Sequence, residues 1–167
     1  MTTLQVRRLV DRDAAEYFEL RREALVREPF AFGSSPGDDR FRSIELVRVM
    51  LLDAEQAVIG AFAPDLIGSV GVLRMNRRKL RHKAEMWGMY VRAEHRGAGV
   101  GRALVEAAIR FACEQEGLRL LHLTVTEKAV AAAALYQSLG FVVWGIDPAG
   151  LHVDGLDVSQ KHMVLTL

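Results

Sequence analysis

The amino-acid sequence predicts a mixed α/β protein with a mostly antiparallel central sheet of about seven strands, flanked by about four helices. Three apolar segments, 57–62, 66–75 and 84–91, follow one another with turns between them, which is typical of an antiparallel meander. Two later helical segments each lie between apolar, strand-like segments. A mixed sheet covered by helices buries the apolar face of every such element.

The first elements of the chain are a short strand and two helices. Residues 4–9 are a strand candidate. Asp13 is followed three residues later by Glu16, which is the spacing of a capping box, and apolar residues then recur at helical spacing until a proline ends the helix. Asp39 is expected to cap a second helix that runs to about Leu52.

The last part of the chain alternates helices and strands. The expected elements are a helix, a strand, a helix and two strands, over 100–116, 118–125, 129–140, 141–145 and 162–167. A long connection, which contains Asp147, Asp154 and Asp157, is expected to lead to the last strand. Because no repeat, low-complexity tract or linker divides the sequence, residues 1–167 are expected to form a single domain.

Composition argues against several classes of protein. The 22 basic and 21 acidic residues leave a formal net charge of +1, so neither nucleic acid nor a membrane surface is expected as a partner. The single cysteine, Cys113, forms no intrachain disulfide and is expected to be buried in its apolar stretch. The five histidines lack metal-ligand spacing, so no metal is expected. The sequence shows no secretory signal and no membrane span, so a cytoplasmic location is expected.

The most informative segment is a glycine-rich turn between a strand and a helix. Glycines there allow positive φ and let a ligand approach the backbone closely. The first N–H groups of the helix have no internal partner and carry partial positive charge, so an anionic phosphate is the matching ligand. The candidate phosphate-binding residues form one continuous run: Arg96, Gly97, Ala98, Gly99, Val100, Gly101 and Arg102.

Other phosphate-binding loops fit this spacing less well. A Walker loop places a Lys-Ser or Lys-Thr pair after its last glycine, whereas Arg102 and Ala103 follow Gly101. A dinucleotide-binding fingerprint counted from Gly99 requires a glycine where the chain has Leu104. A glycine-rich turn that binds no ligand stays open as an alternative.

The run RGAGVGRALVEAA, residues 96–108, resembles the acetyl-CoA pyrophosphate loop of the GNAT superfamily of N-acyltransferases. Four further segments are similar to that family, in the same order along nearly the whole chain: the first helix and substrate loop LRREALVREPFAFGSS, the fourth strand AEMWGMYV, the late signature LYQSLGF and the closing strand HMVLTL.

The resemblance implies a GNAT-like fold that uses acetyl-CoA as co-substrate and no metal. It implies transfer of the acetyl group to a primary amine of a small molecule, peptide or protein, by direct attack in a ternary complex. The pantetheine arm of acetyl-CoA is then expected along the backbone of Met89, Tyr90 and Val91, paired like an extra strand. An ordinary strand, paired on both sides, is the alternative. Acetyl-CoA and an amine are thus the expected partners, with a homodimer as one candidate assembly.

Glu85 is the candidate general base. With a regular pleat it lies on the same face as Trp87 and Met89, and its position resembles that of the glutamate that many family members use directly or through water. A solvent-facing or salt-bridged glutamate near the basic turn before this strand is the alternative.

Tyr136 is the candidate general acid, because it matches the tyrosine of the LYxxxGF signature near the sulfur of CoA. A phenol with a reference pKa of about 10 is protonated at neutral pH and can donate to a nascent thiolate. A core aromatic on an alanine-rich helix is the alternative.

One position departs from the family pattern. Many members carry an asparagine seven residues before this tyrosine, where the chain has Ala129, so that contact is missing or comes from Thr126, Glu127 or Lys128. A catalytically inactive CoA-binding regulatory or adaptor module on the same fold therefore stays open beside the enzyme.

Overall fold

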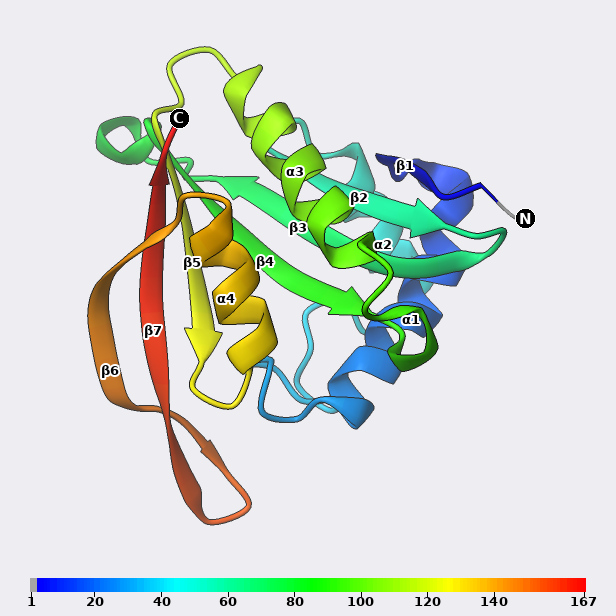
Figure 1. The fold of residues 1–167 in the computed structure, drawn as a ribbon. Coiled ribbons are helices and arrows are strands. Elements are labelled where there is room, and N and C mark those ends of the chain that lie inside the picture. Colours follow the sequence, from blue (N-terminus) through cyan, green and yellow to red (C-terminus); the bar gives the residue numbers. More distant parts are fainter. Residues whose placement is uncertain (1–2) are drawn as a thin grey trace.

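A single mixed sheet organises the computed structural model, which describes residues 3–167 (Figure 1). Its seven strands lie in the order β1-β2-β3-β4-β5-β7-β6. They are β1 (Gln5–Arg8), β2 (Gln56–Phe62), β3 (Leu66–Arg74), β4 (Lys83–Val91), β5 (Leu120–Thr126), β6 (Val142–Val153) and β7 (Leu156–Thr166). Neighbouring strands are antiparallel except β4 and β5, which are parallel. The predicted fold class and the antiparallel meander are confirmed.

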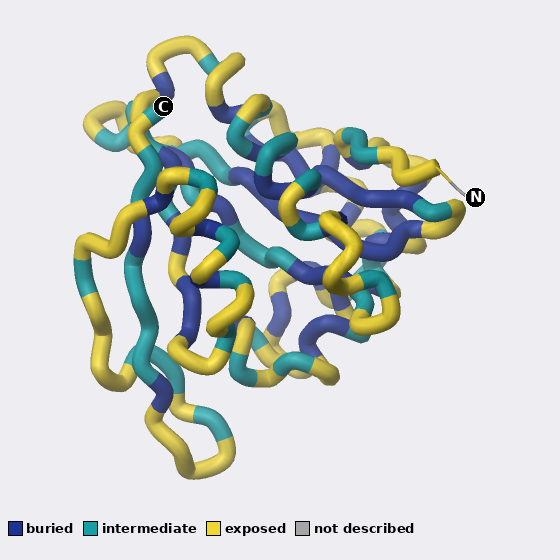
Figure 2. The backbone as a smooth tube through the Cα atoms, in the orientation of Figure 1, coloured by how far each residue is buried: buried dark blue, intermediate teal, exposed yellow. Residues whose placement is uncertain are grey.

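Helices cover both faces of the sheet and create two apolar cores. The four helices are α1 (Ala14–Arg27), α2 (Ile44–Leu52), α3 (Val100–Cys113) and α4 (Val130–Ser138). On one face, α1 and α2 pack on the first strands, with Tyr17 and Val47 among the buried side chains. On the other face, Leu104 of α3 and Tyr136 of α4 are buried against strands that include β5. The buried stretches of the tube in Figure 2 follow these strands and the inner sides of the helices.

The first helix begins directly after Asp13, as predicted, but neither predicted aspartate caps a helix with its side chain. The carboxylate of Asp13 does not cap α1; it accepts hydrogen bonds from the Arg7 guanidinium at 2.6 and 2.8 Å and from the Val10 N–H at 2.8 Å. The second helix begins after Ser43, whose hydroxyl accepts from the Leu46 N–H at 3.3 Å. Each aspartate instead pairs with an arginine of a different element, Asp13 with Arg7 of β1 and Asp39 with Arg21 of α1.

Asp39, the other predicted cap, is buried beside α1. Its carboxylate accepts from Nε of Arg21 at 3.0 Å and from Nη2 at 2.8 Å. Both side chains are less than a tenth exposed. Asp39 therefore ties the loop between α1 and α2 to the first helix.

The end of α3 also departs from expectation. The helix ends at Cys113, and Gly117 lies in the following turn with φ +74°. Cys113 is exposed, so its predicted burial is wrong. Ala112 is buried instead, because it lies on the apolar face of α3. Cys113 is the next residue around the helix and lies outside that face.

The predicted long connection before the last strand is instead a hairpin. β6 continues to Val153, and β7 begins at Leu156 (Figure 1). The turn is formed by Asp154 with φ 51° and Gly155 with φ 78°, and Asp-Gly is the residue pair that such two-residue turns favour. Asp147 and Asp157 therefore lie within strands.

Candidate functional site

The parallel pair β4 and β5 separates part-way along the sheet. Its register runs from Lys83 opposite Leu120 to Glu85 opposite His122 and then stops. Beyond that point the two strands diverge, and α4 and the loop before α3 lie near the opening (Figure 1). The second half of β4 consequently has a strand neighbour on the β3 side alone.

A bulge at Gly88 changes the direction of the β4 side chains. Tyr90 pairs with Ser69 and Trp87 with Gly71, so Gly88 and Met89 together face a single residue of β3. Gly88 has φ +62°, which glycine adopts readily. Trp87 packs with the α1–α2 core and Met89 with the α3–α4 core. The expectation that Met89 lies on the face of Glu85 and Trp87 is therefore wrong, because the extra residue shifts the alternation.

The backbone groups beyond the bulge point to alternate sides of β4. The N–H of Arg92 donates to the Ile67 carbonyl of β3 at 2.9 Å. Successive strand residues present their backbone N–H and C=O groups to opposite sides. The backbone groups of Tyr90 therefore also point to β3, whereas those of Met89 and Val91 point to the opening. Of the three residues predicted to meet the pantetheine arm, two thus present backbone groups to the gap, and Tyr90 does not.

The glycine-rich loop has the backbone that its composition predicts. Gly97 and Gly99 have φ of +78° and +81°, and no heavy atom lies within 4 Å of where a Cβ would stand on either. The first intrahelical bond of α3 runs from the Ala103 N–H to the Gly99 carbonyl. Among residues 3–167, no hydrogen-bond acceptor faces the N–H groups of 97–102. These amides form an open, electropositive turn.

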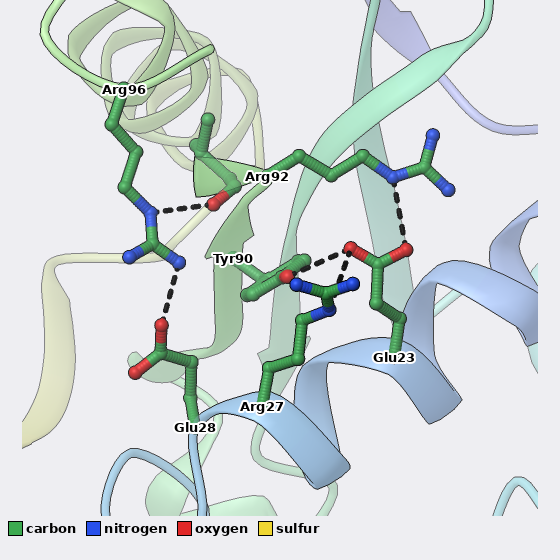
Figure 3. A network of polar contacts seen from close by, with 7 residues as sticks. Glu23, Arg27, Glu28, Tyr90, Arg92 and Arg96 are labelled. Carbon is green, nitrogen blue, oxygen red and sulfur yellow. Dashed lines mark hydrogen bonds and ion pairs between the residues drawn. The ribbon is translucent and has the colours of Figure 1, made fainter. Parts of the chain in front are cut away.

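The two arginines at the ends of this loop are already engaged with protein groups. Arg96 donates from Nε to the Val91 carbonyl at 2.8 Å and from Nη2 to Glu28 at 2.7 Å (Figure 3). Arg102 donates to the Ser138 hydroxyl at 2.8 Å and lies 3.6 Å from Glu106. Arg96 therefore lines the opening, whereas Arg102 points toward α4.

Figure 3 shows how α1 is fastened to the end of β4. Glu23 accepts from the Tyr90 hydroxyl at 2.9 Å and from Nε of Arg92 at 3.0 Å, and it lies 3.8 Å from Arg27. Burial and the hydrogen bond to Glu23 raise the pKa of Tyr90 to about 12. The Tyr90 side chain thus supports the strand from the α1 side.

Three connected cavities follow the gap between β4 and β5. The first, of about 410 Å³, is lined by the β4 end, the glycine loop and the first turns of α4, including Val91, Gly97 and Leu135. The second is a narrow space of about 90 Å³ at the bulge. The third, of about 600 Å³, is open to solvent and is bordered by the α1–α2 loop, β4 and the β6–β7 hairpin. The narrow space shares lining residues with both larger cavities, so it joins them.

Glu85 lines the large cavity between the α1–α2 loop and the hairpin. It is half-buried, and no ion pair or hydrogen bond of its carboxylate is present among residues 3–167. Trp87, two residues along the strand, lines the same cavity. A carboxylate without a protein partner is available to an amine that enters there.

Tyr136 lines the narrow space and is 5% exposed. Its ring meets Phe141 edge to face, with 5.9 Å between centroids. Burial raises the pKa of its hydroxyl to about 12. The phenol therefore stays protonated at neutral pH, beside the junction of the two larger cavities.

Ala129 stands where many family members have an asparagine. Of the three residues expected to replace its contact, two line the same cavities as Ala129 and one does not. Ala129 lines the narrow space and the cavity by the glycine loop. Thr126 lines the narrow space, and its buried Oγ1 has no hydrogen-bond partner in the described chain. Lys128 lines the cavity by the loop, with Nζ 5.0 Å from the Phe30 ring centroid. Glu127 instead accepts from the Ser159 N–H at 3.3 Å.

Apart from Glu85, sequence reasoning missed the polar lining of the large cavity. Arg21, Arg40, Gln160 and His162 also line it, and none was predicted as a site residue. They come from α1, the following loop and β7, and no spacing in the sequence links these segments. The Asp154-Gly155 pair could have predicted a hairpin, and with it the position of the two lining residues on β7.

No group of three or more His, Cys, Asp or Glu side chains within residues 3–167 is placed to hold a metal ion. In the same range, no helix combines the length and apolarity needed to cross a bilayer.

Comparisons with known proteins agree with this architecture. A family model described as "Acetyltransferase (GNAT) family" matches residues 15–141. Human N-acetyltransferase 8B is 38% identical over 103 residues, which are 61% of this chain and 45% of that protein. The chain spans less than half the length of the curated relatives that it matches.

Solved structures share the fold over almost the whole chain. The acetyltransferase of GNAT family from Streptococcus pneumoniae is 26% identical with a TM-score of 0.90, covering 99% of this chain and 100% of that one. The yncA protein of Salmonella typhimurium, solved with its cofactor acetyl-CoA, is 20% identical with a TM-score of 0.83, covering 98% of this chain and 94% of that one.

Proposed function

Because the chain belongs to the GNAT acetyltransferase family, we propose that it transfers the acetyl group of acetyl-CoA to a primary amine of a small molecule, peptide or protein. The observation that carries the proposal is the row of unpartnered amides at 97–102, which opens onto the gap between β4 and β5. An anion-binding turn beside an unpaired strand edge suits a ligand with a diphosphate at one end and amides along its length.

The loop residues fit a diphosphate. Gly97 and Gly99 leave open space where side chains would stand, and the start of α3 adds its dipole to the free N–H groups. Arg96 lies at the same cavity and contributes a cation once its contact with Glu28 is exchanged for phosphate. The proposal thus assigns phosphate contacts to the backbone of 97–102 and to Arg96, while Arg102 contributes long-range charge.

The strand edge beyond the bulge holds the pantetheine arm in this proposal. The backbone groups of Met89 and Val91 face the gap and are free for pairing with amides, apart from the Val91 carbonyl that Arg96 engages. Acetyl-CoA supplies the activated acetyl thioester. In this proposal the Met89 N–H polarises the thioester carbonyl, because preorganised donors contribute strongly to acyl transfer.

Glu85 accepts the proton in the proposed reaction. The ammonium form of the acceptor first loses one proton to solvent, and the neutral amine then attacks; Glu85 takes the second proton from the nitrogen, directly or through water, as the nitrogen–carbon bond forms. Its free carboxylate in the large cavity supports this role, since in this proposal the other large cavity holds acetyl-CoA and the amine occupies this one. Joining the two reactants in connected cavities also removes the entropy cost of a bimolecular encounter.

Tyr136 gives the balancing proton. Its hydroxyl protonates the sulfur as the carbon–sulfur bond breaks, and its raised pKa ensures that the proton is present at neutral pH. Glu85 and Tyr136 then return to their starting states by proton exchange with solvent. The products are the N-acetylated amine and free CoA.

The test combines binding with turnover. Calorimetry with acetyl-CoA is expected to show saturable binding, and CoA release against an amine panel is expected to follow. Absence of binding at millimolar acetyl-CoA would remove the proposal. Binding without CoA release across the panel would favour the inactive CoA-binding module.

A further inference from the structure

The large cavity, where the proposed reaction places the amine, is lined by more positively than negatively charged side chains. Its charged lining side chains are Arg21, Arg40 and Glu85. An amine acceptor enters as a cation before it loses a proton, so a site for a simple amine gains little from two guanidinium groups. We infer that the acceptor of the proposed reaction carries a carboxylate close to its reactive amine. This inference rests on the proposed function.

Arg21 is held in place by its buried partner. Asp39 accepts from Nε and Nη2, and the guanidinium carbon lies 5.6 Å from the ring centroids of Phe32, Phe41 and Trp87. Nη1 has no hydrogen-bond partner among residues 3–167 and lies 3.2 Å from the point that a Cβ on Gly88 would take. Arg21 thus presents one fixed N–H donor group beside the bulge, with its charge balanced by Asp39.

Arg40 supplies the uncompensated positive charge. Its guanidinium carbon lies 4.5 Å from the ring centroid of Phe41 and 5.1 Å from that of Trp87, and these two rings are stacked on each other. No carboxylate within the described chain pairs with it. Stacking on aromatic faces orders a guanidinium while leaving its edge donors free, which is the geometry that binds a carboxylate.

Glu85 provides the negative charge in the lining of the same cavity. A carboxylate for the ammonium and a stacked arginine for a second group match a zwitterion, such as a free amino acid. A volume of about 600 Å³ accommodates a small molecule of this kind. Polyamines match less well, because their second cation would meet Arg40 rather than a carboxylate.

The test compares zwitterionic amines with otherwise identical amines that lack the carboxylate. CoA release is measured with acetyl-CoA and each of the common L-amino acids, and then with the corresponding C-terminal amides. At least one amino acid is expected to be acetylated with kcat/KM at least tenfold above that of its amide. Arg40→Gln is expected to lower kcat/KM for that amino acid at least tenfold and to remove most of the preference over the amide.

Arg42→Gln is the matched control, since Arg42 is an exposed arginine two residues away that does not line the cavity. It is expected to leave both kcat/KM values within twofold. Equal or better turnover of amides, acetylation of polyamines alone, or acetyl-CoA binding without acetylation of any amino acid would overturn the carboxylate inference. These outcomes differ from a failure to bind acetyl-CoA, which would overturn the proposed function itself.

Discussion

Nη2 of Arg96 lies 2.7 Å from the carboxylate of Glu28, at the mouth of the cavity beside the glycine loop. The pair joins the end of α1 to the loop that precedes α3 (Figure 3). Both side chains are more than a third exposed, so the pair contributes about 0–1 kcal/mol to stability. Its larger consequence concerns ligand binding, because a diphosphate and Glu28 require the same cation.

Glu28→Gln is expected to tighten acetyl-CoA binding. Removal of the carboxylate frees Arg96 and removes a like charge near the phosphates, which is worth about 1 kcal/mol, or three- to tenfold in Kd, at low salt. The gain should shrink as salt screens the charges. Calorimetry at two salt concentrations measures it, with Glu19→Gln, on α1 and outside this cavity, as the control. Weaker binding by Glu28→Gln would show that the ion pair holds the loop in its binding geometry.

Gly99→Glu is expected to abolish acetyl-CoA binding, because it places a side chain and a negative charge within the row of free amides. Backbone strain accompanies the change, since Gly99 has φ +81°. Gly155→Glu is the matched control: Gly155 has φ +78°, is equally free of neighbours and lies in the β6–β7 turn. The control should lose comparable stability in thermal denaturation yet retain binding. Equal loss of binding in both variants would assign the effect to strain.

Tyr136→Phe is expected to lower kcat by about 10²–10⁴-fold while acetyl-CoA affinity changes little, if its hydroxyl protonates the sulfur. Single-turnover kinetics and calorimetry separate the two quantities. Tyr17→Phe removes a hydroxyl from another fully buried tyrosine, which lines none of the three cavities, and should leave kcat within twofold. A parallel loss of affinity and kcat in Tyr136→Phe would point to packing.

The sequence predicts the fold best where local chemistry and tertiary structure agree. The apolar runs of β2, β3 and β4 are confirmed as strands; β2 and nearly all of β3 are buried between two layers of helices, and β4 is partly buried. The glycine loop is confirmed as a turn with positive φ, since no other residue adopts that backbone so readily. The assigned roles of Glu85 and Tyr136 stay predictions for the kinetics to decide.

The errors arise where contacts between elements, and not the local sequence pattern, decide the outcome. Asp13 and Asp39 both have the chemistry of helix caps, and each is instead bound by an arginine that the fold brings near. The bulge at Gly88 shifts Met89 to the other face, and a single glycine within a strand does not specify that shift. Arg40 lines the large cavity with its guanidinium carbon 5.1 Å from the Trp87 ring centroid, a contact between elements that no sequence spacing reveals.

Asp39→Asn is expected to destabilise the protein strongly. Breaking a buried ion pair leaves an uncompensated charge and costs about 3–5 kcal/mol, which lowers Tm by roughly 6–20 °C in a chain of this size. The double variant Arg21→Met with Asp39→Asn should recover much of the loss, because no buried charge remains. Asp11→Asn, which breaks the exposed pair with Arg48, is the control and should cost less than about 1 kcal/mol. Thermal denaturation of all three variants measures these differences.

The ion pair between Arg7 and Asp13 is expected to make stability depend on pH in the acid range. Hydrogen bonds from Arg7 and from the Val10 N–H hold the pKa of Asp13 below its usual value. The folded chain therefore binds this proton less readily than the unfolded chain, whose aspartate titrates at about 3.9.

The contribution of the ionised Asp13 carboxylate to the free energy of unfolding is therefore complete above about pH 5. It is lost as the pH falls through about 4 and then through the lower pKa of Asp13 in the folded state. Denaturant unfolding of the wild type and Asp13→Asn from pH 7 to pH 3 measures it. The difference in unfolding free energy between the two should narrow as the pH falls, since the protonated wild-type side chain then resembles the neutral amide. A difference that stays constant over this range would show that Asp13 acts through its shape and its contact with Val10, and not through its charge.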